Sequence, residues 1–200
     1  KTIFVATNRE CWDVQCVADW LDISINDDSI TFYVDENQGE GSRTAVVDVV
    51  AGIKPDVAKA RFKVFQKGAS VIDLSVDETA NSYIAPTNAS FRFDASVKGN
   101  GGDDGNTFYI GYYGLEIVGA AYADLAWEAT FDADKTRSTK IINGYPVYSP
   151  EEKAIYFSTG ASQGNAVISV HNAEGEILWS WHIWVSDEPV RTSEGNGLEW

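Results

Sequence analysis

Positive charge is scarce in this sequence. Its 200 residues carry 15 Lys and Arg against 30 Asp and Glu, so the net charge at pH 7 is -15. Proteins that bind nucleic acids neutralise phosphates with clusters of Lys and Arg, and no such cluster occurs here. We therefore expect no nucleic-acid partner. Most of the negative charge lies after residue 68, because residues 1–68 hold 8 Lys and Arg against 11 Asp and Glu.

Long hydrophobic runs, methionine and a disulfide pattern are also lacking. No segment reaches the ~20 consecutive apolar residues of a transmembrane helix, and no signal-peptide pattern is present, so we expect no membrane insertion by this segment. A chain without methionine is expected to be a piece of a longer protein. Cys11 and Cys16 lie in a predicted strand at an odd spacing, which would point their side chains to opposite faces and prevent a disulfide.

Motifs for catalysis and metal binding are missing as well. His171 and His182 are the only histidines, and neither lies in the spacing of a zinc site. The sequence has no nucleophile elbow, phosphate-binding loop or dinucleotide fingerprint. Its many carboxylates include no pair that stands out as the acid and base of a glycosidase. We expect a non-enzymatic protein that uses no cofactor and no metal.

Short alternating runs of apolar and polar residues, separated by Gly, Asn, Asp and Pro, make up most of the chain. This pattern predicts an all-β fold with little helix. The pattern is interrupted after residue 66, so we expect one β module over residues 1–68, a second β-sandwich module over 71–188, and a mobile tail or truncated linker over 189–200. The predicted strands span residues 2–7, 20–25, 30–35, 44–50, 60–66, 71–76, 81–85, 91–97, 107–112, 125–131, 141–143, 154–158, 165–171 and 177–185. Residues 119–131 would also suit a short helix, but a loop followed by a strand is favoured.

The predicted strand 177–185 contains three of the seven tryptophans. In an extended strand, alternate side chains point to opposite faces. One face would carry Ile177, Trp179, Trp181, Ile183 and Val185, and the other Leu178, Ser180, His182 and Trp184. A strand that is apolar on both faces is usually buried in the middle of a sheet, and we expect core packing for most of these residues. The mixed polar and aromatic face of His182 and Trp184 supports the alternative of a ligand-binding surface.

Two groups of aromatic residues are candidate ligand contacts. Trp20, Trp127, Trp179, Trp181 and Trp184 could stack on sugar rings, since an indole has a flat apolar face and one N–H donor; core packing is favoured for Trp20. The second group comprises Tyr109, Tyr112 and Tyr113, which follow a Gly-, Asn- and Asp-rich loop at residues 99–106. Aromatic rims beside polar loops are common in recognition sites. Calcium binding by this loop is disfavoured, because the ligand spacing of a calcium loop is absent.

Several short segments of the first module occur together in a known family. They are Ala18–Ile23, Val34–Asn37, Ser42–Ala45 and Val64–Gly68, with Asn8 and Trp12. This set closely resembles the BACON domain, the Bacteroidetes-associated carbohydrate-binding often-N-terminal family, over nearly all of residues 1–68. The resemblance implies an immunoglobulin-like β-sandwich in an exported, lipid-anchored cell-surface protein. The second module resembles β-rich regions that follow such domains in surface or adhesion-type proteins of the same bacteria.

The predicted function is that of a non-enzymatic module of a bacterial cell-surface protein. It would bind a polysaccharide or host glycan, or mediate adhesion through protein partners at the cell surface. The candidate ligand-binding residues are Trp184, His182, Tyr109, Tyr112 and Tyr113. Two alternatives remain open, namely a structural spacer or fibre component that holds a more distal domain, and an accessory domain of a glycan-degrading enzyme.

Overall fold

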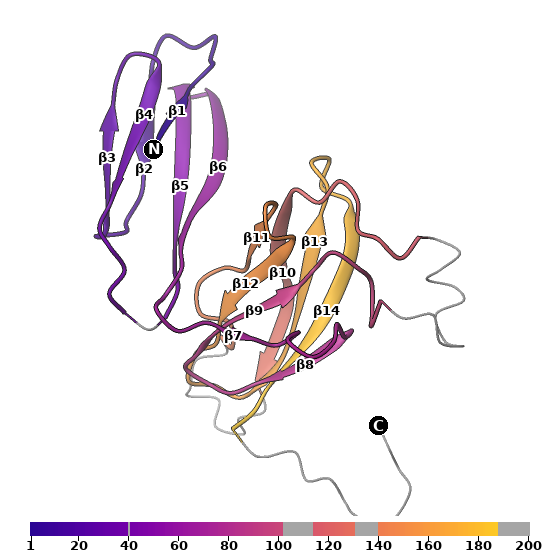
Figure 1. Cartoon of the computed structure of the whole chain (residues 1–200). Helices are drawn as coiled ribbons and strands as arrows, with labels where there is room; N and C mark the ends of the chain where they lie inside the picture. The colour runs from indigo at the N-terminus through magenta and orange to yellow at the C-terminus, as the bar shows by residue number, and fades with distance from the viewer. Residues whose placement is uncertain (40, 102–113, 131–139, 188–200) are drawn as a thin grey trace, which may run out of the picture.

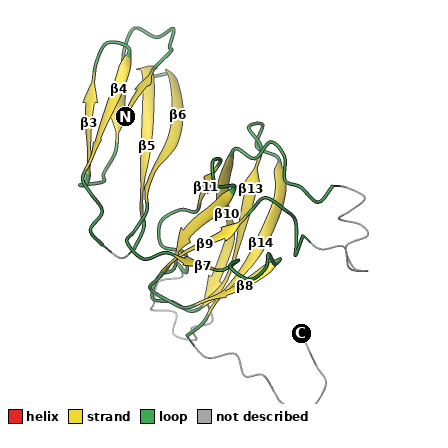
Figure 2. Cartoon of the chain, in the orientation of Figure 1, coloured by secondary structure: helices red, strands yellow, loops and turns green. Residues whose placement is uncertain are grey.

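The computed structural model describes residues 1–39, 41–101, 114–130 and 140–187. Within these ranges all regular structure is β-strand and no helix occurs, which confirms the predicted all-β class (Figures 1 and 2). Accordingly, the described residues include no helix of the length and hydrophobicity that crossing a membrane requires. The predicted tail at residues 189–200 lies outside the described residues.

Residues 2–66 form two three-stranded antiparallel sheets that face each other, which we call the first sandwich. The sheets have the strand orders β1-β4-β3 and β2-β5-β6. The strands are β1 (Thr2–Phe4), β2 (Trp12–Gln15), β3 (Leu21–Ile25), β4 (Ser29–Val34), β5 (Arg43–Ile53) and β6 (Asp56–Gln66). In β5 the buried Ala45, Val47 and Val49 alternate with more exposed residues and meet Ile30 and Phe32 of β4. This alternation fixes the register of β5, because a shift by one residue would turn its apolar side chains out of the core.

Residues 72–185 form the second sandwich, in which two four-stranded sheets enclose a larger core. The sheets have the orders β10-β13-β14-β8 and β11-β12-β9-β7. Their strands are β7 (Ile72–Asp73), β8 (Ser82–Ala85), β9 (Ser90–Asp94), β10 (Tyr122–Thr130), β11 (Val147–Ser149), β12 (Ala154–Ser158), β13 (Gly164–His171) and β14 (Ile177–Val185). The short strands β7 and β8 pair in parallel with β9 and β14, and the other pairs are antiparallel.

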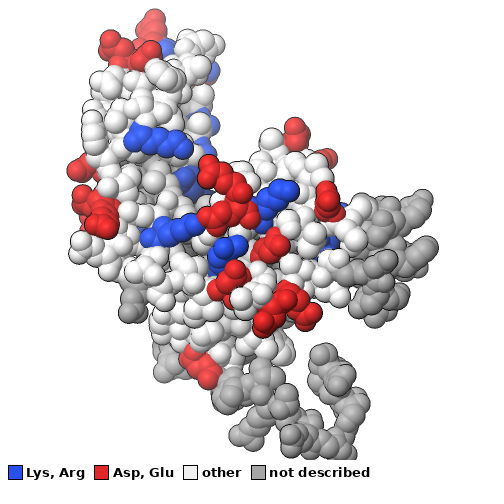
Figure 3. All heavy atoms as spheres, in the orientation of Figure 1, with Lys and Arg blue, Asp and Glu red and all other residues white. Residues whose placement is uncertain are grey.

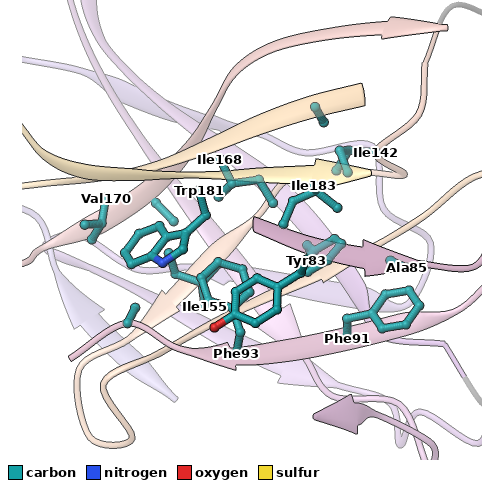
Figure 4. Packing of buried hydrophobic residues seen from close by; sticks show 14 of the residues in the cluster. Tyr83, Ala85, Phe91, Phe93, Ile142, Ile155, Ile168, Val170, Trp181 and Ile183 are labelled. Atoms are coloured by element: carbon teal, nitrogen blue, oxygen red, sulfur yellow. The ribbon is translucent and has the colours of Figure 1, made fainter. Parts of the chain in front are cut away.

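Aromatic side chains fill the middle of the second core. Trp181 is 1% exposed, and its ring centroid lies 5.1 Å from that of Phe93. Phe93 in turn stacks on Tyr83, with 5.0 Å between centroids, and Figure 4 shows these three residues together between the sheets. Large interlocking rings leave little free volume, so this cluster determines how the two sheets pack.

The structure corrects several sequence-based expectations. β11 was not predicted, because it is too short to show a pattern of alternation. β2 lies between Cys11 and Cys16, in the segment that was expected to be a strand. β10 begins at Tyr122, so the stretch that could have been a helix is mostly strand. The predicted strand 141–143 is only an isolated bridge between Ile142 and Thr159. The predicted strand 107–112 lies outside the described residues.

Polar and aromatic contacts join the two sandwiches. Lys67 pairs with Glu152, and Phe65 packs against Tyr156 with 5.3 Å between ring centroids. Tyr156 also donates a hydrogen bond to Glu152. Further from this point, Lys63 Nζ donates to the carbonyl oxygens of Ala123 (3.2 Å) and Pro146 (3.4 Å). Figure 3 shows acidic and basic side chains intermixed on the face where the two sandwiches meet.

The contact at Glu152 predicts a pH-dependent contribution to stability. Hydrogen bonds from Lys67 and then from Tyr156 lower the pKa of Glu152 below its ordinary value. A depressed carboxyl pKa stabilises the folded state above the unfolded-state pKa of about 4.3, and this stabilisation is lost as the pH falls through the folded-state pKa. Because the side chain is 35% exposed, Glu152→Gln should lower the free energy of unfolding by at most about 1 kcal/mol at pH 7.

Urea denaturation at pH 7 and at pH 3 would measure this effect, with Glu151→Gln at the neighbouring exposed position as the control. The difference between wild type and Glu152→Gln should be smaller at pH 3, because the carboxyl group is then protonated in the unfolded state and the depressed pKa contributes less to stability. An equal difference at both pH values would show that the ionised contact contributes nothing.

Candidate functional site

The candidate site lies on the side of the sheet β10-β13-β14-β8 that faces away from the core. Two rows of side chains cross the four strands there, as the strand register shows. Trp127, Val167, His182 and Ser82 form one row, and Ala129, Asn165, Trp184 and Ile84 form the next. We call these eight residues the outer aromatic face.

Two tryptophans of this face are open to solvent. Trp127 is 49% exposed and Trp184 is 50% exposed, whereas Trp181, on the other side of β14, is 1% exposed. Ile84, which pairs with Trp184, is 45% exposed. The expectation that β14 is buried on both faces is therefore wrong, because the strand is central in its sheet but only one of its faces packs against the core.

A β-bulge brings Trp127 onto this face. Ala123 and Leu125 of β10 pair with the buried Val170 and Ile168, so strict alternation would also point Trp127 into the core. The register shifts between Leu125 and Trp127, and Trp127 then pairs with Val167 of the outer face. A bulge inserts one extra residue into a strand, so the side chains that follow it point to the opposite side of the sheet from the one that regular alternation predicts. A second shift, between Val170 and His171, turns Ile177 outward, so its predicted position on the Trp181 face is wrong.

His182 lies between the two exposed tryptophans. Its ring centroid is 6.5 Å from that of Trp127 and 5.9 Å from that of Trp184, with an interplanar angle of 66° to the latter. His182 Nε2 donates to Asn165 Oδ1 at 2.7 Å, which fixes the ring. In the neutral imidazole, Nδ1 is then the hydrogen-bond acceptor. The imidazole therefore supplies a positioned polar atom between two apolar surfaces.

The exposed indoles also keep their N–H groups available. Trp179 Nε1 donates to Asn81 Oδ1 at 2.9 Å and Trp12 Nε1 to the Asp27 carbonyl at 3.4 Å. Among the described residues, the Nε1 atoms of Trp127 and Trp184 have no protein acceptor. Both can donate to a ligand that rests on the rings.

This side of the sheet is nearly uncharged although the chain is strongly acidic. The residues that point outward from its four strands are Ser82, Ile84, Tyr122, Asp124, Trp127, Ala129, Asn165, Val167, Ser169, His171, Ile177, Ser180, His182 and Trp184. Asp124 is the only Asp, Glu, Lys or Arg among them, and it lies 3.8 Å from Lys63 Nζ. Such a surface suits an uncharged ligand that offers hydroxyl groups and apolar C–H groups.

The structure brings together two of the five predicted site residues, Trp184 and His182. The other three, Tyr109, Tyr112 and Tyr113, lie outside the described residues. Asn165 was not predicted to belong to the site. It could have been recognised as a polar residue in the strand that pairs with the tryptophan-containing strand β14. Trp20, expected in the core, packs against the first core cluster and carries the Arg43 guanidinium 4.4 Å from its ring centroid.

Metal ligands do not gather in the described part of the chain, where no group of three or more His, Cys, Asp and Glu is placed to hold an ion. Cys11 and Cys16 are both free thiols. The arrangement of the outer aromatic face is thus one of stacking surfaces and hydrogen-bonding groups.

Comparison with known proteins gives one family match. Residues 10–67 match the BACON family, described as "Putative binding domain, N-terminal". The match covers most of the first sandwich and none of the outer aromatic face. No curated protein matches the chain.

Three solved structures show remote likeness to the chain. A SusE-like surface-located polysaccharide-binding protein from the heparin utilisation locus of Bacteroides thetaiotaomicron is 10% identical, with a TM-score of 0.31 over 88% of this chain and 77% of that one. Cadmium-bound SporoSAG is 10% identical, with a TM-score of 0.23 over 88% and 71%. A chimeric titin Z1Z2 carrying a peptide from decorin is 11% identical, with a TM-score of 0.24 over 88% and 83%. At such low scores the likeness does not extend to a ligand or a function.

Proposed function

We propose, from the match of residues 10–67 to the BACON family model, that the chain is a non-enzymatic carbohydrate-binding module of a bacterial cell-surface protein. The observation that carries the proposal is the pair of half-exposed tryptophans, Trp127 and Trp184, on either side of a fixed histidine. A location at the cell surface, with a lipid anchor, is part of the proposal and rests on the resemblance of residues 1–68 to BACON domains.

The chemistry of sugars fits this face. A pyranose ring has an apolar face of C–H groups, which packs on an indole, and a rim of hydroxyl groups, which need hydrogen-bond partners. The outer aromatic face offers both, through two indole rings, their N–H groups, the Asn165 amide and His182 Nδ1. Polysaccharides and host glycans are therefore the proposed ligands.

A second role is favoured by the contacts between the sandwiches. Lys63 of the first sandwich and Lys67, directly after its last strand, contact backbone and carboxylate oxygens of the second sandwich at two separate points. A tandem fastened in this way can also act as a spacer that holds a more distal domain. The spacer role predicts no glycan ligand, and this separates it from the leading proposal.

The test is binding to a glycan array of plant polysaccharides and host mucin glycans, followed by calorimetry with the strongest hit. Trp184→Ala should weaken that binding about thirty-fold, which corresponds to about 2 kcal/mol, the size typical of an aromatic hot spot. Tyr33→Ala is the matched control, since Tyr33 is an exposed aromatic residue (61%) on the first sandwich.

Unchanged affinity of the Trp184→Ala variant would refute the assignment of the site. If no glycan binds the wild-type chain, the carbohydrate proposal fails and the spacer or protein-adhesion role takes its place.

A further inference from the structure

A cavity of about 570 Å³ lies between the two sandwiches. β6 of the first sandwich contributes Arg61, Phe62 and Lys63, and the second sandwich contributes Tyr122, Asp124 and Tyr145 among others. Its volume falls within the ~300 to 1,000 Å³ of small-molecule sites. The walls come from both modules, so this site exists only in the tandem.

Aromatic rings and hydrogen-bonding groups line the cavity. Tyr145 is 45% exposed, and Lys63 Nζ lies 5.0 Å from its ring centroid. The same ammonium group is held by the Ala123 and Pro146 carbonyls, so it positions the tyrosine ring with a fixed charge. Tyr145 thus presents an open ring face in a wall whose polar groups are already in place.

Tyr122 connects this cavity to the outward side of the sheet. It lines the cavity and also points outward from β10, where it is 41% exposed. Its ring stacks on His171 with 4.8 Å between centroids and an interplanar angle of 6°. His171 is fixed in turn, because its Nδ1 donates to the Gly175 carbonyl (3.1 Å) and its Nε2 forms a hydrogen bond with Ser169 Oγ (2.8 Å).

The distance between the two ends determines the size of the ligand. Asn165, beside Trp184, and His171, beside Tyr122, lie six residues apart on β13. At about 3.4 Å per residue this corresponds to about 20 Å along the strand. A single sugar ring cannot reach both ends, whereas a linear chain of several rings can.

We propose that the outer aromatic face and the cavity between the sandwiches form one extended site for a linear oligosaccharide, which runs from Trp184 and Trp127 past Tyr122 to Tyr145. This inference rests on the proposed carbohydrate-binding function and adds the length of the ligand and a second contact region. It also gives the junction of the sandwiches a part in recognition.

The probes for the test are size-fractionated oligosaccharides of two to about eight units, prepared from the polysaccharide that scores highest on the array. Calorimetry should show affinity rising at least ten-fold from the shortest to the longest fraction, as each added contact contributes binding free energy. Tyr145→Ala should remove this gain and leave the shortest fraction unaffected. Trp184→Ala should weaken binding at every length, and Tyr33→Ala should change none of these affinities.

The outcomes separate the two proposals. Affinity that does not depend on length, or that keeps its full length dependence in Tyr145→Ala, overturns the extended site but leaves the outer aromatic face intact. Tyr145→Phe retains the aromatic ring and removes only the hydroxyl group. This variant should keep most of the rise in affinity from the shortest to the longest oligosaccharides. Failure of every polysaccharide to bind, or no effect of Trp184→Ala, overturns both.

Discussion

Replacing Trp181 by alanine should destabilise the second sandwich by about 4 kcal/mol, the usual cost of deleting a buried tryptophan. The side chain is 1% exposed and packs against Phe93 in the centre of the core. Its removal leaves a large cavity between two sheets whose backbone pairing restricts their collapse. Urea denaturation followed by circular dichroism would measure the loss.

The matched control is Trp184→Ala, which removes the same side chain from the opposite face of the same strand. Because Trp184 is 50% exposed, its removal should cost less than about 1 kcal/mol. The expected pattern is therefore a strong effect on stability at residue 181 and a strong effect on binding at residue 184. Equal destabilisation by both variants would contradict the assignment of the two faces.

Replacing Gly164 by alanine should destabilise the second sandwich by about 3 kcal/mol, near the upper end of typical overpacking effects. A Cβ atom at this position would lie 2.1 Å from the Ala129 carbonyl oxygen and 2.4 Å from Ile141 Cδ1. The first contact is with backbone, which cannot rotate away, so β10 and β13 would have to separate where Gly164 pairs with Thr130.

Gly160→Ala is the control for this prediction. A Cβ there would meet the Ile141 and Lys140 carbonyl oxygens at 3.6 Å, an ordinary contact distance. Its free energy of unfolding should stay within about 0.5 kcal/mol of wild type. Thermal denaturation of the two variants gives the comparison, and a Gly164→Ala variant as stable as Gly160→Ala would contradict the close approach of the strands.

Strand β14 shows how far the sequence could predict this structure. Its bounds, Ile177–Val185, match the predicted strand, and the alternation placed Trp181 and Trp184 on opposite faces correctly. The dense apolar pattern was also a correct indication that β14 is central in its sheet. What the pattern could not show is that the second sandwich covers only one face of that sheet, since coverage depends on residues far away in the sequence.

The two bulges account for side-chain directions that regular alternation could not predict. Trp127 follows Ala123 and Leu125 at even spacing, and even spacing in a regular strand predicts the same face. Its outward position depends on one extra residue between Leu125 and Trp127, whose presence is determined by pairing with β13. Ile177 was misplaced for the same reason.

Contacts between residues far apart in the chain could likewise not be predicted from the sequence. Lys67 and Glu152 are 85 residues apart, and Tyr145 comes near Lys63 only through the packing of the two sandwiches. Charge and composition do not identify such partners, because many acidic residues could pair with any one lysine. The cavity between the sandwiches follows from these contacts and could not have been predicted.

The most direct measurement of the central claim is an NMR titration that follows the indole N–H signals of the tryptophans while the array's strongest glycan is added. Single Trp→Phe variants would assign each signal. The outer aromatic face predicts that the signals of Trp127 and Trp184 shift with the ligand, while those of Trp181 and Trp179 stay in place. If the shifts instead appear at Trp12 or Trp20 of the first sandwich, or at no indole, the outer aromatic face is not the binding site.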